Sequence, residues 1–539
     1  MVVRDELILV LDLTSTILRA GVGVHDLIRG PLVELPTRLG RKLNTTGTQV
    51  EDFLVGQHLF QAEHRMRNGG QREFEDVNPL RMDGKVGFEV VDWVGLEAVF
   101  RYALHTSLAL ARPPISNSTV LSIPPSLPPS TVDRLHRLLF ERLLVPSLLL
   151  STRPFFAAAA AGVLSCLVLD LGYRGEGSEI SVVHDNMVFE SAGGLRLPHL
   201  DEGVCDDYCA LRLLEADPTL PQQLGAGKGT GATELGPGEL VYALRAMVTE
   251  LKTRGLIGFE SPLLSVVAPT AGAAEGAGGE EEGSFDVAKA IVDGKVSDMV
   301  KKKGKGKAVE GEEEAGDFVT VVNPFAPPPP AVDLTLGPND QPPPPPYSQI
   351  RLGPARHRYL EPLFIPSMIS SLAPSSSAAA AALNMAEYER FSTPEGRRLV
   401  DEGGVHEAIG SVISRVSEAE VRHAVSETVV VVSSGRIGSN KALHSTLAPL
   451  LSPFRPDPDS ATLAAIAAEG GIAPQRGIRV TTAPEYFASF KERAGDWGVY
   501  LGGCVVGKLL IGDSQSKLFM SKADYIASGP AHYRILEKV

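Results

Sequence analysis

The sequence predicts a duplicated α/β fold with a cleft between its two halves. The main observation is a pattern that occurs twice, in which an apolar strand ends at an aspartate and is followed by a tight turn, a strand, a second turn and a third strand. The two aspartates are Asp12 and Asp170, and each follows a continuous apolar run typical of a strand buried on both faces. At roughly 150 residues per domain, a chain of 539 residues allows two to four domains.

The order of strands and turns is the same in both units. The strands expected in the first unit cover 7–12, 17–24 and the region near 32–33, and those in the second cover 166–170, 180–184 and 187–190. A polar turn at 14–16 separates the first two strands of the first unit, and a glycine-rich turn at 172–177 does so in the second. Such an internal repeat favours two similar halves that enclose a binding cleft.

Amphipathic helices are expected between these strands. Asp92 is a suitable N-cap for a helix with apolar residues at 93, 96, 100 and 103. Ser130 with Asp133 is expected to cap a second helix, and a third is expected over 240–251. All three have the apolar stripe of helices that pack on a core.

The composition restricts the class of protein. The net charge of −14 argues against a surface that binds nucleic acid by charge alone. Four cysteines in so long a chain indicate a reducing compartment, and Cys205 and Cys209, with His199 nearby, are expected in the core and not at a metal site. The segment 1–6 does not resemble a signal peptide, and the longest apolar run, 155–169, is too short to cross a bilayer, so a soluble protein is expected.

Much of the glycine and proline is concentrated in one part of the chain. The chain has 54 glycines and 40 prolines, and residues 268–354 combine many of them with acidic stretches. Such a segment buries too little apolar surface to offset the entropy of ordering, so we expect a disordered insertion that is dispensable for folding. Its basic run, Lys301–Lys307, fits a nuclear import signal and a solvated linker equally well.

Several motifs occur in the order in which they are found in the actin family and resemble its motifs. The most specific are Tyr-Leu-Gly-Gly-Cys at 500–504 and Ser-Lys-Ala-Asp-Tyr-Ile-Ala-Ser-Gly-Pro at 521–530, which are similar to W-I-G-G-S and S-K-x-E-Y-x-x-S-G-P. Shorter matches to L-P-H, L-F-Q-P-S and G-I-H-E lie at 197–199, 363–367 and 404–407. The resemblance covers nearly the whole chain outside about 265–352.

This resemblance implies an actin-like fold, which is a duplicated ribonuclease-H-like, two-domain α/β fold with a central cleft. Domain I would span 1–160 and be completed by about 490–539, while domain II would span 161–489 and contain the disordered insertion at 268–354.

Members of the family bind ATP between their halves, and the resemblance implies which residues would face the nucleotide. Two hairpin turns offer N–H groups and small hydroxyls to the phosphates, and an aspartate beside each turn orders Mg²⁺ through water. The positions that match form a degenerate nucleotide cleft: Asp12, Ser15, Arg19, Asp170, Gly172 and Gly435. Threonines at 14 and 16 replace the glycines of the first turn, Arg19 replaces the phosphate-binding lysine, and the second turn lacks its second carboxylate.

The groups that activate water in the family are replaced too. By counting from neighbouring motifs, Arg153 stands at the position of the water-orienting glutamine, and Gly177 stands at that of a histidine. A guanidinium has no acceptor and cannot take the proton of an attacking water. The third nucleotide loop, S-G-G-T-T in actin, reads Ser-Ser-Gly-Arg-Ile at 433–437. The expectation is a protein that is not an enzyme and requires no cofactor, with residual binding of ATP and Mg²⁺ left open.

Among divergent members, the sequence looks most like the fungal nuclear actin-related proteins of the ninth class, which belong to the SWI/SNF and RSC chromatin remodellers. That likeness implies a structural subunit in the nucleus, paired with a second actin-related protein on the helicase-SANT-associated helix of the remodeller ATPase. It implies neither direct sequence-specific binding of nucleic acid nor a membrane. The trough expected to receive the helix has Val163 and Leu164 in its wall.

Two other functions remain open at this point. The chain could be a working ATP-binding actin-fold protein of a cytoskeletal or chaperone-like kind, supported by Asp12, Ser15 and Asp170. It could also be an actin-like subunit of another assembly, such as a dynein-activating or histone-acetylating complex. Nucleotide binding tests the first alternative, and co-purification tests the second.

Overall fold

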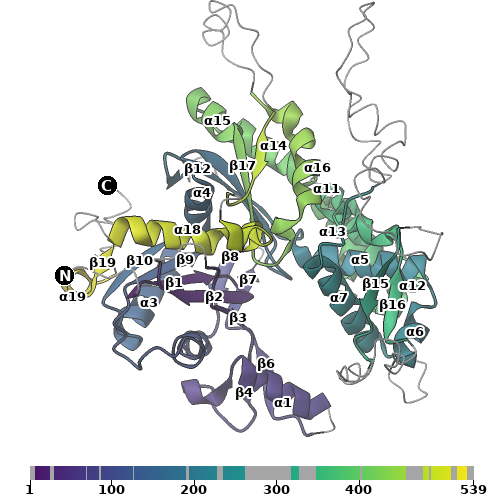
Figure 1. Cartoon of the computed structure of the whole chain (residues 1–539), viewed down its shortest axis with the longest axis horizontal. Coiled ribbons are helices and arrows are strands. Elements are labelled where there is room, and N and C mark those ends of the chain that lie inside the picture. The colour runs from purple at the N-terminus through teal and green to yellow at the C-terminus, as the bar shows by residue number, and fades with distance from the viewer. Residues whose placement is uncertain are drawn as a thin grey trace, which may run out of the picture.

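Two β-sheets with the same connectivity form the centre of the molecule (Figure 1). The computed structural model describes residues 7–24, 29–67, 70–83, 87–125, 127–189, 194–227, 235–261, 317–326, 347–400, 403–456, 477–484, 487–511 and 519–530. The first sheet has the strand order β19-β10-β9-β1-β2-β3, and the second has the order β13-β12-β11-β17-β18 with β14 paired to β12. In each sheet three successive antiparallel strands are followed by two strands parallel to the first of them, which confirms the predicted duplication.

The strands of the first sheet are β1 (Leu9–Leu13), β2 (Ile17–Val22), β3 (Val33–Pro36), β9 (Thr119–Ile123), β10 (Ser147–Thr152) and β19 (Met520–Ser521). Those of the second sheet are β11 (Cys166–Leu171), β12 (Ser178–His184), β13 (Met187–Val188), β14 (Leu195–Leu197), β17 (Thr428–Ser433) and β18 (Arg479–Thr481). Smaller sheets contain β4 (Leu39–Lys42), β5 (Phe53–Leu54) and β6 (Phe74–Val77); β7 (Leu80–Asp83) and β8 (Gly87–Val90); and β15 (Val319–Val322) and β16 (Gln349–Leu352).

The α-helices are α1 (Gln57–Arg67), α2 (Trp93–Arg101), α3 (Pro129–Arg137), α4 (Arg153–Ala161), α5 (Glu202–Ala216), α6 (Leu220–Ala226), α7 (Pro237–Thr253), α11 (Glu361–Phe364), α12 (Ala378–Leu383), α13 (Pro394–Val400), α14 (Val405–Arg415), α15 (Ala419–Ser426), α16 (Lys441–Leu451), α18 (Ala494–Ile511) and α19 (Lys522–Ser528). Short 3₁₀ or π turns are η2 (Val50–Asp52), η3 (Tyr102–Ser107), η4 (Leu138–Arg142), η6 (Pro354–Arg358), η7 (Pro366–Leu372), η8 (Ala386–Ser392), η9 (Ile437–Ser439), η10 (Ser452–Phe454) and η11 (Ala488–Phe490).

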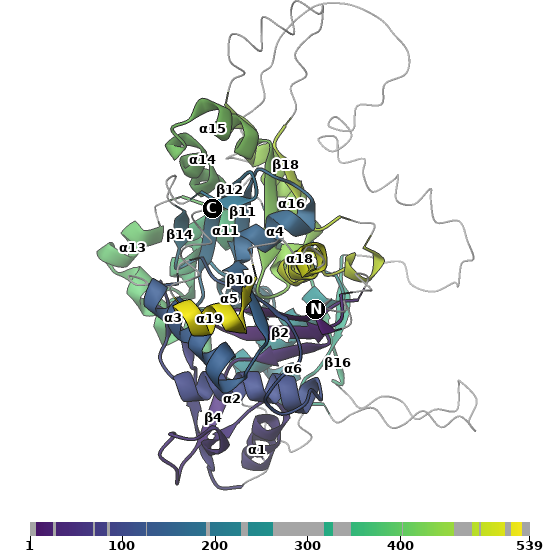
Figure 2. The ribbon, with the colours of Figure 1, turned by 90° about the vertical axis from the view of Figure 1, so that its left-hand side faces the viewer.

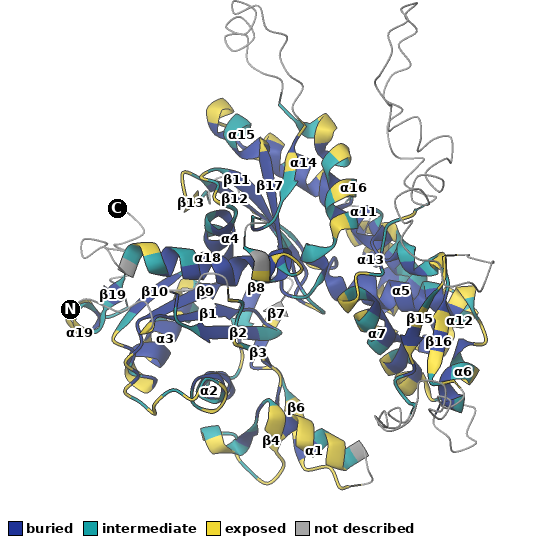
Figure 3. Ribbon diagram, in the orientation of Figure 1, coloured by how far each residue is buried: buried dark blue, intermediate teal, exposed yellow. Residues whose placement is uncertain are grey.

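We call the first sheet with its packed elements the first lobe, and the second sheet with its packed elements the second lobe. Each lobe has its own apolar core. A third core lies between them and contains Val10 of β1, Val168 of β11, Phe156 of α4 and Leu501 of α18. Helix α18 lies beside α4, as Figure 2 shows with α18 end-on, and is buried along most of its length in Figure 3. The domain boundaries predicted near 160 and 490 stay predictions.

The predicted helices are present, with one error in a cap. Asp92 caps α2 by accepting a hydrogen bond from the N–H of Gly95, as expected. Ser130 does not cap α3, because the helix begins at Pro129 and its N-cap residue, Pro128, makes no side-chain cap. Proline at the first helical position has a preset φ and lacks the N–H that would need a partner, so this helix starts earlier than predicted.

The predicted disordered insertion at 268–354 is too long. Within it, Val319–Val322 and Gln349–Leu352 pair as the antiparallel strands β15 and β16. Their inward-facing side chains, including Val321 and Ile350, join the core of the second lobe. Apolar residues alternate in both short segments, and the compositional argument overlooked this pattern. Deleting 268–354 would remove both strands, while Lys301–Lys307 lies outside the described residues.

Two further findings concern general properties of the described ranges. No helix there is both long and apolar enough to span a bilayer. Cys205 and Cys209 of α5 are fully buried, as predicted, and no group of three or more His, Cys, Asp or Glu side chains in those ranges could hold a metal ion.

Candidate functional site

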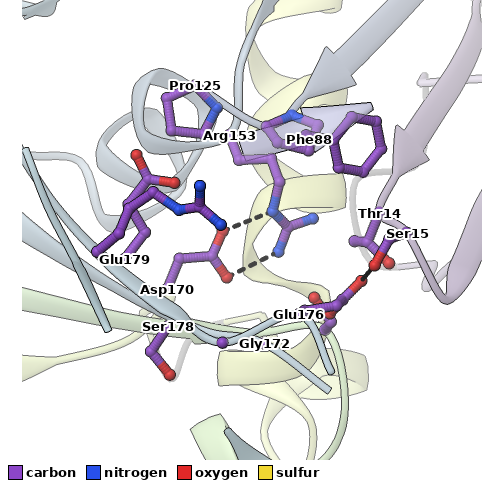
Figure 4. A pocket seen from close by; sticks show the side chains of 14 residues that line it. Thr14, Ser15, Phe88, Pro125, Arg153, Asp170, Gly172, Glu176, Ser178 and Glu179 are labelled. Atoms are coloured by element: carbon purple, nitrogen blue, oxygen red, sulfur yellow. Dashed lines mark hydrogen bonds and ion pairs between the residues drawn. The ribbon is translucent and has the colours of Figure 1, made fainter. Parts of the chain in front are cut away.

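The two repeated aspartates lie in the cleft between the lobes, on either side of one arginine. Asp12 lies near the end of β1 and is fully buried, and Asp170 lies near the end of β11 with 13% of its side chain exposed. Arg153, the first residue of α4, lies between them and is 2% exposed. Its Nε is 2.6 Å from Asp170 Oδ2 and its Nη2 is 3.1 Å from Asp170 Oδ1 (Figure 4). Its Nη1 is 2.5 Å from Asp12 Oδ1. A guanidinium therefore takes the place between the carboxylates where the resemblance implies hydrated Mg²⁺.

Arg19 extends this arrangement into a row of alternating charges. Its Nη1 is 3.2 Å from Asp12 Oδ2, and its Nε is 3.2 Å from Oε1 of Glu34 on β3. The row runs from Glu34 through Arg19, Asp12 and Arg153 to Asp170. Burial by itself would raise the pKa of Asp12, but the charges of Arg153 and Arg19 outweigh that effect and hold it below its usual value. The resemblance implies a phosphate-binding cation at position 19, but this cation is already neutralised within the chain.

Glu176 satisfies the donors of the first hairpin turn. Its Oε1 accepts hydrogen bonds from Ser15 Oγ at 2.7 Å, from Thr16 N at 3.0 Å and from Thr16 Oγ1 at 3.1 Å. Its Oε2 accepts one from the N–H of Tyr173 at 2.7 Å. Figure 4 shows Glu176 directed at Ser15 from the turn between β11 and β12. A carboxylate of the chain thus accepts the bonds that the turn would offer to a phosphate.

Glu202 accepts hydrogen bonds in the same way from the loop 433–437, which resembles the third nucleotide loop of actin. Its Oε2 accepts hydrogen bonds from the N–H groups of Arg436 at 2.6 Å and Ile437 at 2.9 Å. Its Oε1 is 2.5 Å from Lys252 Nζ, so the buried carboxylate is also paired with a charge. A Cβ added at Gly435 would lie 2.0 Å from Glu202 Oε2. Glycine is needed at position 435 because any larger residue would collide with the Glu202 carboxylate.

Gly172 has a role within its own turn. Its N–H donates to the carbonyl oxygen of Gly177 at 2.9 Å, and a Cβ at position 172 would lie 2.0 Å from that oxygen. Gly177 has a positive φ of 67° and lies against Pro198, so both glycines serve the shape of the hairpin.

Little space is left for a ligand in the cleft. The cavity beside Arg153, Asp170 and Glu176 has a volume of about 40 Å³. A single water needs on the order of 10–15 Å³, so this space holds a few water molecules. The residues present do not fit bound ATP with Mg²⁺, because the donors of the turns and the position between the aspartates are taken by side chains of the chain.

The resemblance to actin implies one cleft for Asp12, Ser15, Arg19, Asp170, Gly172 and Gly435, and the structure brings these residues together between the lobes. Val163 and Leu164 lie elsewhere, beyond the C-terminal end of α4, which ends at Gly162 with a left-handed φ of 68°. Val163 packs partly against the core between the lobes, while Leu164 is 62% exposed.

Sequence reasoning missed Glu176 and Glu202. The sequence did offer a sign of the role of Glu176. A carboxylate in a turn that is expected to bind phosphates would repel them, so its presence argues against phosphate binding there. Glu202 offered no such signal, because its contact with the 433–437 loop joins segments more than 200 residues apart and depends on the tertiary fold.

Glu179 of β12 gives the cleft a pH-dependent stability. Burial and, to a smaller extent, the nearby Asp170 raise its pKa to about 7, although the charges of Arg196 and Arg153 oppose the shift. A raised folded-state pKa means that the contribution to stability is present below the unfolded-state pKa and is lost as pH rises through about 7. At pH 8 the free energy of unfolding of Glu179→Gln should therefore be about 1–2 kcal/mol higher than that of the wild type. At pH 4 the two proteins should be equally stable. The exposed Glu420→Gln is the control, and equal effects of the two changes at pH 8 would contradict this assignment.

The fold and the cleft together define a class, which is a two-lobed α/β protein of duplicated, actin-like fold whose cleft is filled by its own side chains. In a comparison with protein families, the actin family (Actin) matches residues 4–193, from before β1 to beyond β13. This match identifies an actin family domain there and supports membership in the actin family. No curated protein matched the chain.

Proposed function

We propose that this chain is a non-catalytic structural subunit that uses the actin fold to bind a partner helix, and that it does not hydrolyse ATP. The observation that carries the proposal is the position of Arg153, whose guanidinium bridges Asp12 and Asp170 in the cleft. Burial opposes its charge, but Asp12 and Asp170 raise the pKa of Arg153, so it stays protonated and cannot accept a proton from water.

The assembly that we propose is a nuclear chromatin-remodelling complex of the SWI/SNF or RSC kind. There the chain would pair with a second actin-related protein on the helicase-SANT-associated helix of the remodeller ATPase. The support is that some motifs of the chain match those of actin while its nucleotide loops do not. The motifs at 500–504 and 521–530, which lie in α18 and around α19, remain close to those of actin, while all three nucleotide loops are altered.

The surface that we propose for the helix lies at the C-terminal end of α4. Leu164 and Met187 are exposed by 62% and 66%, and they are close in space because the N–H of Asn186 donates to the Leu164 carbonyl at 2.9 Å. Exposed aliphatic side chains of this kind suit an amphipathic helix that anchors through positions i, i+3, i+4 and i+7.

The first test is catalytic. Steady-state phosphate release by the purified chain with MgATP should equal that of a buffer control. Release well above the control, and lost in Asp170→Asn, would instead favour the alternative of an ATP-binding actin-fold protein in a cytoskeletal or other assembly. That alternative is supported by the retained residues Asp12, Ser15 and Asp170.

The second test concerns the partner. The purified chain, with its actin-related partner present, should bind the helicase-SANT-associated helix stoichiometrically and independently of ATP. Leu164→Asp should weaken that complex at least about tenfold, because a carboxylate would be desolvated in an apolar contact. Leu399→Asp, at a leucine of α13 that is 48% exposed, is the matched control. Absence of helix binding by the folded wild type under all nucleotide conditions would rule out the remodeller assignment and leave the fold unaffected.

A further inference from the structure

Glu176 connects the two lobes directly. The residue belongs to the turn between β11 and β12 of the second lobe and is 6% exposed. Ser15 and Thr16, which donate three hydrogen bonds to it, belong to the turn between β1 and β2 of the first lobe. The fourth donor, the N–H of Tyr173, fixes the carboxylate within its own turn. Bonds to an ionised acceptor are among the stronger hydrogen bonds in proteins.

Arg153 makes a second connection a short distance away. It joins Asp12 of the first lobe to Asp170 of the second, and the latter contact is bidentate. All three side chains are largely removed from solvent, so salt screens these pairs weakly. Glu176 adds to the field that keeps Arg153 charged. The two connections therefore form one cluster of charged side chains that spans the cleft.

We infer that Glu176 and Arg153 form a built-in latch that holds the lobes closed in place of a nucleotide. The resemblance to actin implies that the phosphates of a nucleotide would accept hydrogen bonds from the turns of both lobes and that its cation would lie near both aspartates. Here a carboxylate supplies the acceptor and a guanidinium supplies the cation. The closed arrangement is then constitutive, and it does not depend on which partner the protein binds.

The latch is tested by measuring the distance between the lobes in the full chain. Spin labels are attached at Ser130→Cys on α3 of the first lobe and at Gln222→Cys on α6 of the second, which lie on opposite sides of Figure 1. The four natural cysteines are buried, so the labels react at the introduced positions. Double electron–electron resonance then gives the distance distribution with and without millimolar MgATP.

The wild type should give one narrow distribution that MgATP does not change. Glu176→Ala combined with Arg153→Gln should decrease the ratio of closed to open molecules by at least about a hundredfold and add a population at longer distance. Because that double variant removes buried charge pairs and can unfold, Ser15→Ala with Thr16→Val weakens the latch from the other lobe and should shift the distribution in the same direction. Glu420→Ala, an exposed carboxylate change on α15, should leave it unchanged.

Two results would overturn the inference. One is a wild-type distribution that shifts on addition of MgATP, since closure would then depend on nucleotide. The other is a distribution in the folded latch variants that is identical to the wild type, since other contacts would then hold the lobes. Neither result bears on helix binding, so failure of the latch and failure of the proposed function are distinguishable.

Discussion

Arg153→Met is expected to lower the free energy of unfolding by about 3–5 kcal/mol. The change removes the guanidinium and leaves the carboxylates of Asp12 and Asp170 in a region where both are largely shielded from water. A buried charge without its partner keeps the full cost of desolvation, which is why breaking such a pair costs far more than breaking one at the surface. Arg19 still contacts Asp12, but Asp170 loses both of its hydrogen bonds from Arg153.

Equilibrium unfolding in urea measures this loss. Arg81→Met is the control, since Arg81 pairs with Glu89 at the surface with 61% of its side chain exposed, and its loss should cost less than about 1 kcal/mol. Adding Asp170→Asn to Arg153→Met should restore much of the stability, because it removes the carboxylate that has lost its partner. A cost for Arg153→Met no greater than that for Arg81→Met would show that the cleft does not contain this buried cluster.

Gly502→Ala is expected to lower the free energy of unfolding by about 2–3 kcal/mol, although alanine favours helix over glycine by about 1 kcal/mol. A Cβ at position 502 of α18 would lie 1.8 Å from the carbonyl oxygen of Phe156 in α4 and 2.5 Å from its carbon. Backbone atoms inside a helix cannot move aside as a side chain can, so α18 would have to move away from α4. That movement would disturb the core between the lobes.

Gly507→Ala in the same helix is the matched control. Its Cβ would lie 3.2 Å and 3.4 Å from methyl groups of Val120 and Ile8, which can shift slightly, so the change should stay within about 1 kcal/mol of the wild type. Thermal and denaturant unfolding of both variants tests the comparison. Equal stability of the two would mean that α18 does not pack against α4 at Gly502.

The repeated units were predictable because each depends on local sequence. A continuous apolar run ending at Asp12 or Asp170, followed by a turn and two further strands, defines its hairpins without reference to the remainder of the chain. The same applies to Asp92, whose cap lies within one helical turn. Ser130 shows the limit of such reasoning, because Pro129 takes the first helical position and the helix begins before the predicted cap.

The occupants of the cleft could be predicted only in part. The resemblance to actin implies that Arg153 stands at the position of the water-orienting glutamine, and the chemistry of a guanidinium then predicts the loss of water activation. The bridging role of Arg153 depends on the approach of two strands that lie far apart in the sequence. The role of Glu202 could not be predicted at all, because nothing in the neighbouring sequence distinguishes it from a surface residue at the start of a helix. Composition likewise misplaced the end of the insertion, since alternation in β15 and β16 outweighs the surrounding glycine and proline.

We infer that the chain's own side chains exclude a nucleotide from the cleft. Equilibrium titration of the full chain with a fluorescent ATP analogue in the presence of Mg²⁺ tests it most directly, with conventional actin as the positive control. We expect no saturable binding up to millimolar nucleotide. Binding of one analogue per chain with a micromolar Kd, displaced by unlabelled ATP, would contradict it.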